Sequence, residues 1–192
     1  MRRGNLFVIS GPSGAGKGTL VARLVSQMPD AWVSVSVTTR APRTTERAGI
    51  DYSFVTKDEF DRLVKADGLL EWAEVHGCCY GTPRKTVEDK MLAGKQVILE
   101  IDVQGAFQVR QKLPQAHLVF IEPPSMDELE RRLRQRGTET PEEIGKRLRT
   151  AHQELAHKAE YDFRLMNDDL DEACRRLAAY VDEKAERETP VI

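Results

Sequence analysis

Residues 11–19, GPSGAGKGT, carry the residue types of a phosphate-binding loop. Glycines allow backbone N–H groups to approach phosphate oxygens closely, and Lys17 adds a charge for the terminal phosphates of a nucleotide. The apolar run LFVIS precedes the loop and a helical pattern follows it, which is the context that such a loop requires. The usual pattern has a hydroxyl directly after the lysine, whereas this chain has Gly18 there and Thr19 one residue later. We therefore predict a nucleotide phosphate site without the usual hydroxyl ligand for Mg²⁺.

A second basic cluster, TTRAPR, places Arg40 and Arg43 on either side of a proline that stiffens the turn. Two guanidinium groups held close together suit one phosphate, which they can bind through paired hydrogen bonds. Tyr52 and Tyr80 follow, and either phenol could donate to the same phosphate. A solvated surface turn and half-buried tyrosines would explain the same residues without a ligand.

Glu71 lies among apolar residues in the segment LLEWAEV, and a buried acid needs partners. The N1–H and N2–H groups of a guanine ring are two neighbouring donors that match one carboxylate. Thr82 could donate to the O6 atom of the same base. From spacing alone, an exposed acid on a strand is an equally good interpretation.

The segment RRLRQRGTETPEEIGKRL places arginines on two helices around a short loop. A basic helical face is usually just solvated. In a phosphoryl-transfer enzyme, arginines on a mobile flap would stabilise the charge of the transition state and exclude water.

Short apolar strands alternate with helical patterns along the chain, which predicts an α/β fold with a parallel sheet and helices on both faces. Ligands of such sheets lie beyond the carboxyl ends of the strands, where Glu100 and Asp102 end the run QVILEID. The alternation of Val with Ser or Thr predicts one strand over residues 32–39. Thr82 is expected to cap a helix that begins at Pro83.

Three capping boxes are predicted as helix starts. They pair Thr56 with Glu59, Ser125 with Glu128, and Thr140 with Glu143.

The 192 residues, 40% of them apolar, are enough for one domain with a sizeable core. The formal net charge of -2 gives no general attraction to nucleic acid or to an anionic membrane, and no apolar run approaches the roughly 20 residues of a membrane-spanning helix. Three cysteines fit neither a disulfide framework nor a metal site. Free thiols in a reducing cytoplasm are the expected state.

Taken together, these motifs closely resemble guanylate kinase, which phosphorylates GMP with ATP. In chain order, the stretches that carry the resemblance are GPSGAGKGT, SVTTRAPR, GIDYSFV, EWAEVHGCCYGT, LEIDVQGA, RRLRQRGTETPEEIGKRL and MNDD. They cover nearly the whole chain. The first stretch alone would indicate only a nucleotide kinase, whereas the arginine pair, EWAEV and YGT narrow the resemblance to guanine.

The resemblance implies a role for residues of each motif. GMP would be held by Ser36, Arg40, Arg43, Tyr52, Glu71, Tyr80 and Thr82, with Glu100 and Asp102 near the ribose, base or metal. ATP would be held by Gly11, Pro12, Ser13, Gly14, Ala15, Gly16, Lys17, Gly18 and Thr19, with Asn167 beside the adenine. The catalytic charges would come from Lys17, Arg132, Arg136 and Arg147.

The resemblance also implies a P-loop core with two smaller parts that close on the substrates. The GMP-binding part would span residues 36–82 and the lid residues 127–158, leaving residues 1–35, 83–126 and 159–192 as the core. Mg²⁺ would enter with ATP, held mainly by phosphates and water. The sequence does not identify the protein groups that would bind Mg²⁺ directly.

This sequence departs from the family pattern where Cys78 and Cys79 replace an asparagine and a tyrosine before Tyr80, which puts the packing under Tyr80 in question. Two alternatives stay open. One is another nucleoside monophosphate kinase, and the other is a guanylate-kinase-like interaction module without catalysis. Intact Lys17 and lid arginines argue against the second.

Overall fold

The computed structural model describes residues 2–75, 77–137 and 140–186, and its centre is a sheet of five parallel strands in the order β2-β7-β1-β8-β9. The strands are β1 (Asn5–Ser10), β2 (Ala31–Val33), β7 (Gln96–Glu100), β8 (His117–Glu122) and β9 (Phe163–Met166). β1 is therefore the central strand. Its apolar run without polar alternation is typical of a strand that is covered on both faces.

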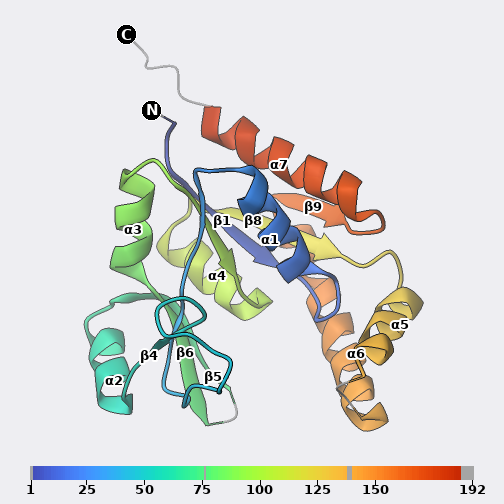
Figure 1. Ribbon diagram of the computed structural model, residues 1–192, viewed down its shortest axis with the longest axis horizontal. Helices are drawn as coiled ribbons and strands as arrows, with labels where there is room; N and C mark the ends of the chain where they lie inside the picture. The colour runs from blue at the N-terminus through green and yellow to red at the C-terminus, as the bar shows by residue number, and fades with distance from the viewer. Residues whose placement is uncertain (1, 76, 138–139, 187–192) are drawn as a thin grey trace.

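Helices cover both faces of this sheet (Figure 1). They are α1 (Lys17–Gln27), α3 (Arg84–Leu92), α4 (Val103–Lys112) and α7 (Leu170–Glu186). Successive residues of β1 point to opposite faces, as the period of a strand requires. Phe7 and Ile9 pack with α1 and α7, whereas Leu6 and Val8 pack with α3 and α4. The predicted fold class is confirmed.

A second, mixed sheet has the order β4-β3-β6-β5. Its strands are β3 (Val37–Thr38), β4 (Ser53–Phe54), β5 (Leu69–Val75) and β6 (Cys78–Pro83), and α2 (Lys57–Lys65) packs against it. Its small core consists of Val37, Phe60, Leu69 and Cys79. Cys79 is therefore a core residue of this sheet, and the strand that carries Tyr80 is packed despite the departure from the family pattern.

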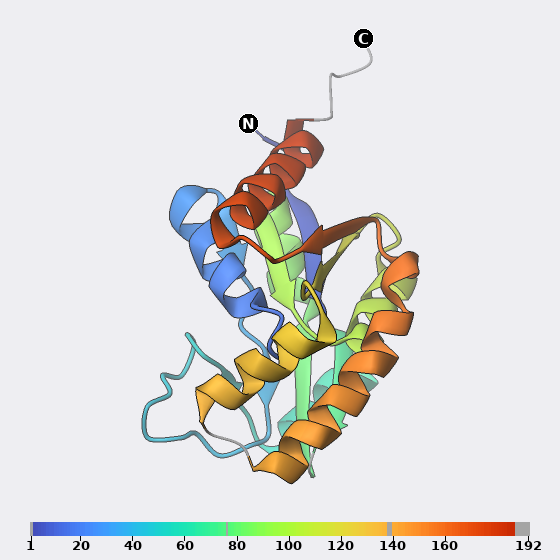
Figure 2. The same cartoon turned by 90° about the vertical axis from the view of Figure 1, so that its right-hand side faces the viewer.

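Two helices, α5 (Met126–Arg136) and α6 (Pro141–Ala156), form a pair at the side of the molecule, and the short helix η1 (Lys158–Glu160) follows them (Figure 2). Leu129, Leu133, Ile144 and Ala151 give the pair a core of its own. Residues 138 and 139 of the expected flap loop lie outside the described residues. No helix in the described ranges is both long enough and apolar enough to span a membrane.

The prediction of one strand over residues 32–39 is wrong. β2 ends at Val33 in the large sheet, where the N–H of Ser34 donates to the carbonyl oxygen of Ile98 at 2.9 Å. β3 begins at Val37 in the second sheet. The alternation of residue types continues across this junction, but the hydrogen-bonding partners change, and periodicity does not reveal which sheet a strand joins.

The predicted cap at Thr82 is also wrong. α3 begins at Arg84 with Pro83 as its N-cap and no side-chain hydrogen bond, because Thr82 still belongs to β6. Its hydroxyl instead donates to Oε1 of Glu71 on the neighbouring strand, at 2.6 Å.

Two of the three predicted capping boxes are confirmed in full. Thr56 with Glu59 and Thr140 with Glu143 make both reciprocal hydrogen bonds. Ser125 accepts from the N–H of Glu128. The Glu128 carboxylate binds two arginines, as described below.

Candidate active site

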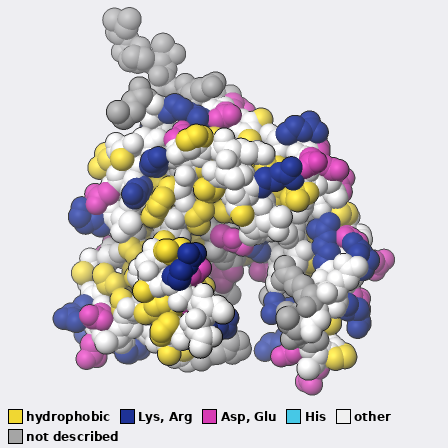
Figure 3. All heavy atoms as spheres, in the orientation of Figure 1, with side chains coloured by type: hydrophobic (Ala, Val, Ile, Leu, Met, Phe, Trp, Pro, Cys, Tyr) yellow, Lys and Arg dark blue, Asp and Glu magenta, His cyan; other side chains and the backbone are white. Residues whose placement is uncertain are grey.

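A cleft of about 800 Å³ lies at the carboxyl end of the large sheet. Figure 3 shows the molecule hollowed between the second sheet and the α5–α6 pair, with acidic side chains at the inner end of the hollow. The cleft is lined by Gly11, Ser13, Lys17, Tyr52, Glu100, Ile101, Asp102, Glu143, Lys146, Arg147, Thr150 and Glu154. The structure thus brings together predicted residues from the phosphate loop, the second sheet, the end of β7 and the lid.

The phosphate loop connects β1 to α1 and turns at three glycines with positive φ, namely Gly11, Gly14 and Gly16. A side chain at Gly16 would also collide with its surroundings, because its Cβ would lie 2.3 Å from Nδ2 of Asn167. α1 has no side-chain cap and no acid in its first turn. Its first N–H groups and the positive end of its dipole are therefore available to an anion.

Lys17 lies at the start of α1, and its ammonium group donates to the loop carbonyl oxygens of Gly11 and Pro12. Burial raises the pKa of Glu100 above its usual value, and the positive charge of Lys17 partly offsets this effect. The lysine thus lies on the loop, near enough to the acid at the end of β7 for their charges to interact. This is the place where terminal phosphates of a nucleotide would lie.

Glu100, the last residue of β7, and Asp102, two residues later, have different surroundings. Oδ1 of Asp102 accepts from the N–H of Gly105 at 2.8 Å and so caps α4. Glu100 faces the residue that lacks the hydroxyl, because a Cβ on Gly18 would lie 3.6 Å from its Oε2. No cluster of three His, Cys, Asp or Glu side chains in the described residues is arranged to enclose a metal. The carboxylates fit Mg²⁺ only as one or two ligands beside phosphates and water, which is how Mg²⁺ is often bound with nucleotides.

Arg40 and Arg43 of the predicted arginine cluster lie on the turn after β3. The Arg40 guanidinium lies over the Tyr52 ring, 5.5 Å from its centre, and the Tyr52 and Tyr80 rings meet edge to face. The Arg43 side chain is exposed, and Ser36 is half-buried one residue before β3. Tyr80 lies on β6, Tyr52 lies directly before β4, and Ser36 and the two arginines flank β3, so only the fold of the second sheet brings them together.

Glu46 is a residue of this cluster that the sequence did not reveal. Its Oε1 accepts from Nη2 of Arg40 at 2.7 Å, and its Oε2 accepts from the backbone N–H of Arg43 at 2.8 Å. Hydrogen bonding to these two groups holds the pKa of Glu46 below its usual value. The one available signal was an acid three residues after Arg43, a spacing that suits a turn.

Glu71 is buried, with 7% of its surface exposed, on β5. Burial raises the pKa of its carboxyl group, the hydrogen bond from Thr82 lowers it, and the charge of Asp102 raises it. Its Oε2 lies so close to α4 that a Cβ on Gly105 would be 3.1 Å away. The single hydroxyl proton of Thr82 is used on Glu71 here, so in this conformation Thr82 orients the acid. Its predicted contact with guanine O6 is a separate role that stays a prediction.

The lid arginines reach the loop region from two helices. Nη1 of Arg147 on α6 donates to Oγ of Ser13 at 2.6 Å. Nε of Arg132 on α5 donates to Oε1 of Glu128 at 2.8 Å, and Nε of Arg131 donates to its Oε2 at 2.7 Å. Hydrogen bonding from Arg131 and Arg132 lowers the pKa of Glu128 to about 2. The side chain of Arg136 lies outside the described residues, so its predicted role stays untested.

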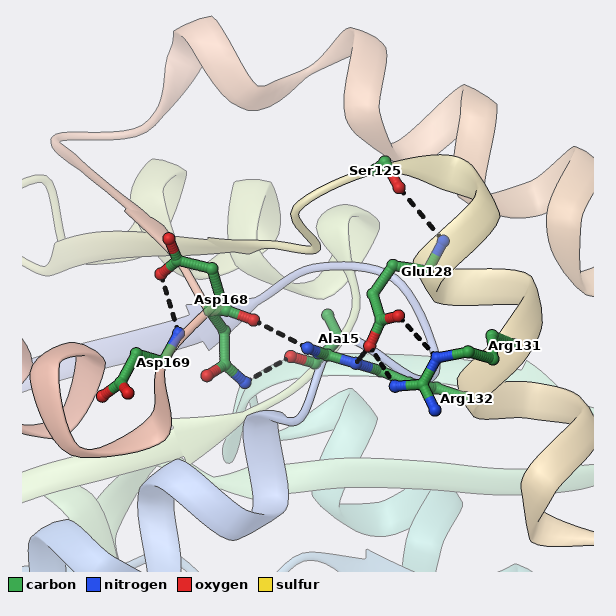
Figure 4. A network of polar contacts seen from close by, with 8 residues as sticks. Ala15, Ser125, Glu128, Arg131, Arg132, Asp168 and Asp169 are labelled. Atoms are coloured by element: carbon green, nitrogen blue, oxygen red, sulfur yellow. Dashed lines mark hydrogen bonds and ion pairs between the residues drawn. The ribbon is translucent and has the colours of Figure 1, made fainter.

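Asn167 connects α5 to the phosphate loop. Figure 4 shows the polar network around Arg132, Glu128 and Ala15. The backbone carbonyl oxygen of Asn167 accepts from Arg132 at 3.0 Å, and its side-chain amide donates to the carbonyl oxygen of Ala15 at 2.8 Å. A second cavity of about 400 Å³ beside this network is lined in part by Arg132, Asn167 and Gly16. The position suits the predicted adenine site, although the structure also gives Asn167 a role in bracing the loop.

A phosphate loop after the central strand of a parallel sheet, with its cleft at the carboxyl edge, defines a P-loop nucleotide-binding protein. The chain belongs to the guanylate kinase family, whose sequence model matches residues 3–184. It is 53% identical over 178 residues to a guanylate kinase of Synechococcus sp. (strain CC9902), covering 93% of this chain and 95% of that protein. It is 54% identical over 177 residues to a guanylate kinase of Streptomyces kasugaensis, covering 92% of this chain and 86% of that protein.

A solved structure is also similar. The crystal structure of guanylate kinase from Anaplasma phagocytophilum superposes with a TM-score of 0.76 at 35% identity, covering 97% of this chain and 89% of that one. The agreement supports both the large sheet and the family membership.

Proposed function

We propose that this protein transfers the γ-phosphoryl group of ATP to a phosphate oxygen of GMP, giving ADP and GDP, with dGMP as a second acceptor. The observation that carries the proposal is that residues of both predicted phosphate sites line one cleft. Lys17 from the loop and Tyr52 from the arginine cluster line the same cavity. One site alone would bind a nucleotide, whereas two facing sites place a donor and an acceptor for direct, in-line transfer.

ATP would bind with its phosphates on residues 11–19, where the open start of α1 and Lys17 supply positive charge. The adenine would lie in the cavity beside Asn167 and Arg132. GMP would bind with its phosphate on Arg40, Arg43, Ser36 and the two tyrosines of the cluster. Its base would meet the carboxylate of Glu71, which Thr82 orients.

The chemistry needs little beyond position and charge. The phosphate of GMP is already ionised at neutral pH, so a strong general base is unnecessary, and no covalent intermediate with the protein is required. Arg132, Arg136 and Arg147 would close over the phosphates, neutralise charge and exclude water. Mg²⁺ entering with ATP would neutralise phosphate charge, with Glu100 as the nearest carboxylate to the loop position that lacks a hydroxyl.

The moving parts would be the GMP-binding part, residues 36–82, and the lid, residues 127–158, around a core of the remaining residues. We also infer a cytoplasmic location, because the three cysteines are free thiols. ATP and GMP are the inferred partners, with neither nucleic acid nor a membrane among them. Oligomeric state stays open.

The proposal is tested by measuring ADP formation from ATP with GMP, dGMP, AMP, CMP and UMP in turn. GMP should give the highest kcat/KM and dGMP the next. A higher value with AMP or a pyrimidine monophosphate would make the chain a different nucleoside monophosphate kinase. Tight GMP binding without ADP formation would make it an interaction module.

Gly18 provides a prediction about Mg²⁺. Gly18→Ser adds a hydroxyl, and the new Cβ fits because it would lie at an ordinary contact distance, 3.6 Å, from Glu100. We expect kcat and the Mg²⁺ concentration for half-maximal rate to change less than about tenfold, or about 1.4 kcal/mol. Gly18→Ala is the matched control, since it adds the same Cβ without the hydroxyl. A gain above tenfold with serine alone would show that the native site lacks a needed ligand.

Glu46 provides a prediction about GMP. Glu46→Gln keeps the shape but weakens the bond to the Arg40 guanidinium, so the phosphate-binding turn should lose its order. We expect KM for GMP to rise about tenfold, with KM for ATP nearly unchanged. The control Glu172→Gln removes a carboxylate that pairs with Arg175 on α7, far from the turn. Equal effects on both substrates would contradict a role specific to GMP.

A further inference from the structure

A second large cavity, about 590 Å³, lies at the opposite edge of the large sheet. Asn5 and His117, which line it, are the first residues of β1 and β8, whereas the active-site cleft lies beyond the carboxyl ends of these parallel strands. We call this cavity the basal pocket. In Figure 1 the N-terminal segment and the end of α7, which supply Arg2, Arg3 and Lys184, lie at the far end of the molecule from the second sheet.

The wall that carries Arg3 is fixed by buried contacts. Nε2 of Gln96, a fully buried residue, donates to the carbonyl oxygen of Arg3 at 2.8 Å. Nδ2 of Asn5 donates to Oε1 of the same Gln96 at 3.0 Å. The backbone of Gly4 packs on the end of α3 so tightly that a Cβ would lie 2.0 Å from the carbonyl oxygen of Met91. The backbone on this side of the pocket is therefore held in place without a ligand.

The charged residues that line the basal pocket are all basic, although the whole chain is slightly acidic. Arg2, Arg3 and Lys184 line it, and no Asp or Glu is among its described lining residues. Acids outside the lining pair with two of these bases, Arg2 with Asp30 and Asp182, and Lys184 with Glu183. The Lys184 ammonium also lies over the Tyr180 ring, 5.1 Å from its centre. These ion pairs are partly exposed, so a ligand can outcompete them at low cost.

The half-buried ring of His117 lies at the base of the pocket, stacked on Phe7. Burial lowers the pKa of His117, and the charges of Lys184, Arg110 and Arg3 lower it further, while Asp162 acts in the opposite direction. The direction of these effects agrees with a positive local potential. A neutral imidazole there can still donate or accept one hydrogen bond.

The remaining lining is partly apolar. Leu6, Met91 and Leu92 contribute to it, and Leu92 is 85% exposed on the end of α3. The volume lies within the range of about 300–1,000 Å³ that small-molecule sites occupy. A basic rim around an apolar wall suits an organic phosphate whose body is flat and weakly polar.

We propose that the basal pocket is a second ligand site, separate from the active site, that binds a nucleoside polyphosphate through Arg2, Arg3 and Lys184, with its base against Leu92 and Met91. The proposal does not depend on the function proposed above, because none of these residues lines the cleft. A ligand here would bridge the N-terminal segment, α3 and α7.

The test uses the NMR signals of the His117 ring as a local reporter during titration with UTP and, separately, with inorganic triphosphate, which has the same number of phosphates. UTP should shift the His117 signals to saturation and bind at least about tenfold more tightly than triphosphate, since only UTP adds contacts to the apolar wall. Lys184→Glu replaces attraction by repulsion and should weaken UTP binding about tenfold or more. Arg3→Gln is a second, milder variant that should weaken it in the same direction.

Lys57→Glu is the matched control, because it makes the same charge change on α2. It should leave the titration unchanged. Lys17→Ala should also leave it unchanged, which separates the basal pocket from nucleotide binding in the cleft. The absence of a saturable His117 shift, or a shift that Lys17→Ala abolishes, would overturn the proposal. Equal affinity for UTP and inorganic triphosphate would overturn its nucleoside part.

Discussion

Lys17→Ala is expected to lower kcat by about 10²–10³-fold while the protein stays folded, since removing one group that stabilises transition-state charge typically costs this much. Lys17 is only partly buried. Its described hydrogen bonds are to carbonyl oxygens of the loop, so removing the side chain should leave the hydrophobic core intact. The loss should therefore fall on catalysis more than on the free energy of unfolding. Single-turnover rates with ATP and GMP, together with urea unfolding, measure both quantities.

Lys17→Met separates charge from packing. It keeps most of the length of the side chain but not the charge, so it should be as slow as Lys17→Ala if the ammonium group acts on phosphate. If methionine restored much of the rate, the main role of Lys17 would be to support the loop. Near-normal turnover in folded Lys17→Ala would contradict the assignment of residues 11–19 as the ATP phosphate site.

Glu71→Gln is expected to reduce the ratio of kcat/KM for GMP to kcat/KM for AMP. Only the loss of kcat in Lys17→Ala should be larger. Guanine presents two donors to a carboxylate, whereas adenine presents an acceptor beside one donor. Sites built to bind a substrate group can reject an analogue without it by roughly 10⁴-fold. Glutamine replaces one acceptor oxygen by a donor, which should cost GMP about 1.5–3 kcal/mol. The measurement is kcat/KM for both monophosphates in wild type and variant.

The variant should fold, because its remaining side-chain oxygen can still accept the hydrogen bond from Thr82. Thr82→Ala is a milder variant, because it leaves the charge of Glu71 in place. It should reduce the preference for GMP over AMP by a smaller factor. An unchanged ratio of the two kcat/KM values in Glu71→Gln would mean that Glu71 does not read the base.

The pH dependence follows from the same residue. Burial raises the pKa of Glu71, so its carboxyl group gains a proton at a higher pH than an exposed glutamate would. GMP recognition should therefore weaken earlier as the pH falls, because the protonated acid offers a donor to N1–H. In Glu71→Gln this component of the pH profile of kcat/KM should be absent.

The sequence predicted most of the fold because its signals are local. The apolar run of β1, the glycines of the loop and the Thr140–Glu143 box each reflect a short-range physical requirement. The division of residues 32–39 between two sheets was missed, because both strands have the same alternation and only tertiary pairing separates them.

The candidate site shows the same limit. Lys17 and Tyr52 were identified from residue type, and the fold brings both to one cleft. The positioning contacts were not identifiable. Glu46 belongs to no sequence motif. Its hydrogen bond with Arg40 depends on where the Arg40 side chain points after the turn folds. The proline after Thr82 predicts a helix start there, whereas the strand pairing of β5 with β6 directs the Thr82 hydroxyl to Glu71.

The most direct test follows the fate of the terminal phosphate of ATP. Wild-type protein is incubated with ATP labelled with ³²P at the γ position, Mg²⁺ and GMP, and the labelled products are separated. Transfer to GMP predicts that the label appears in the β-phosphate of GDP in equal amount to the ADP formed. Label released as inorganic phosphate, or carried by a different acceptor in preference to GMP, would contradict the proposed reaction.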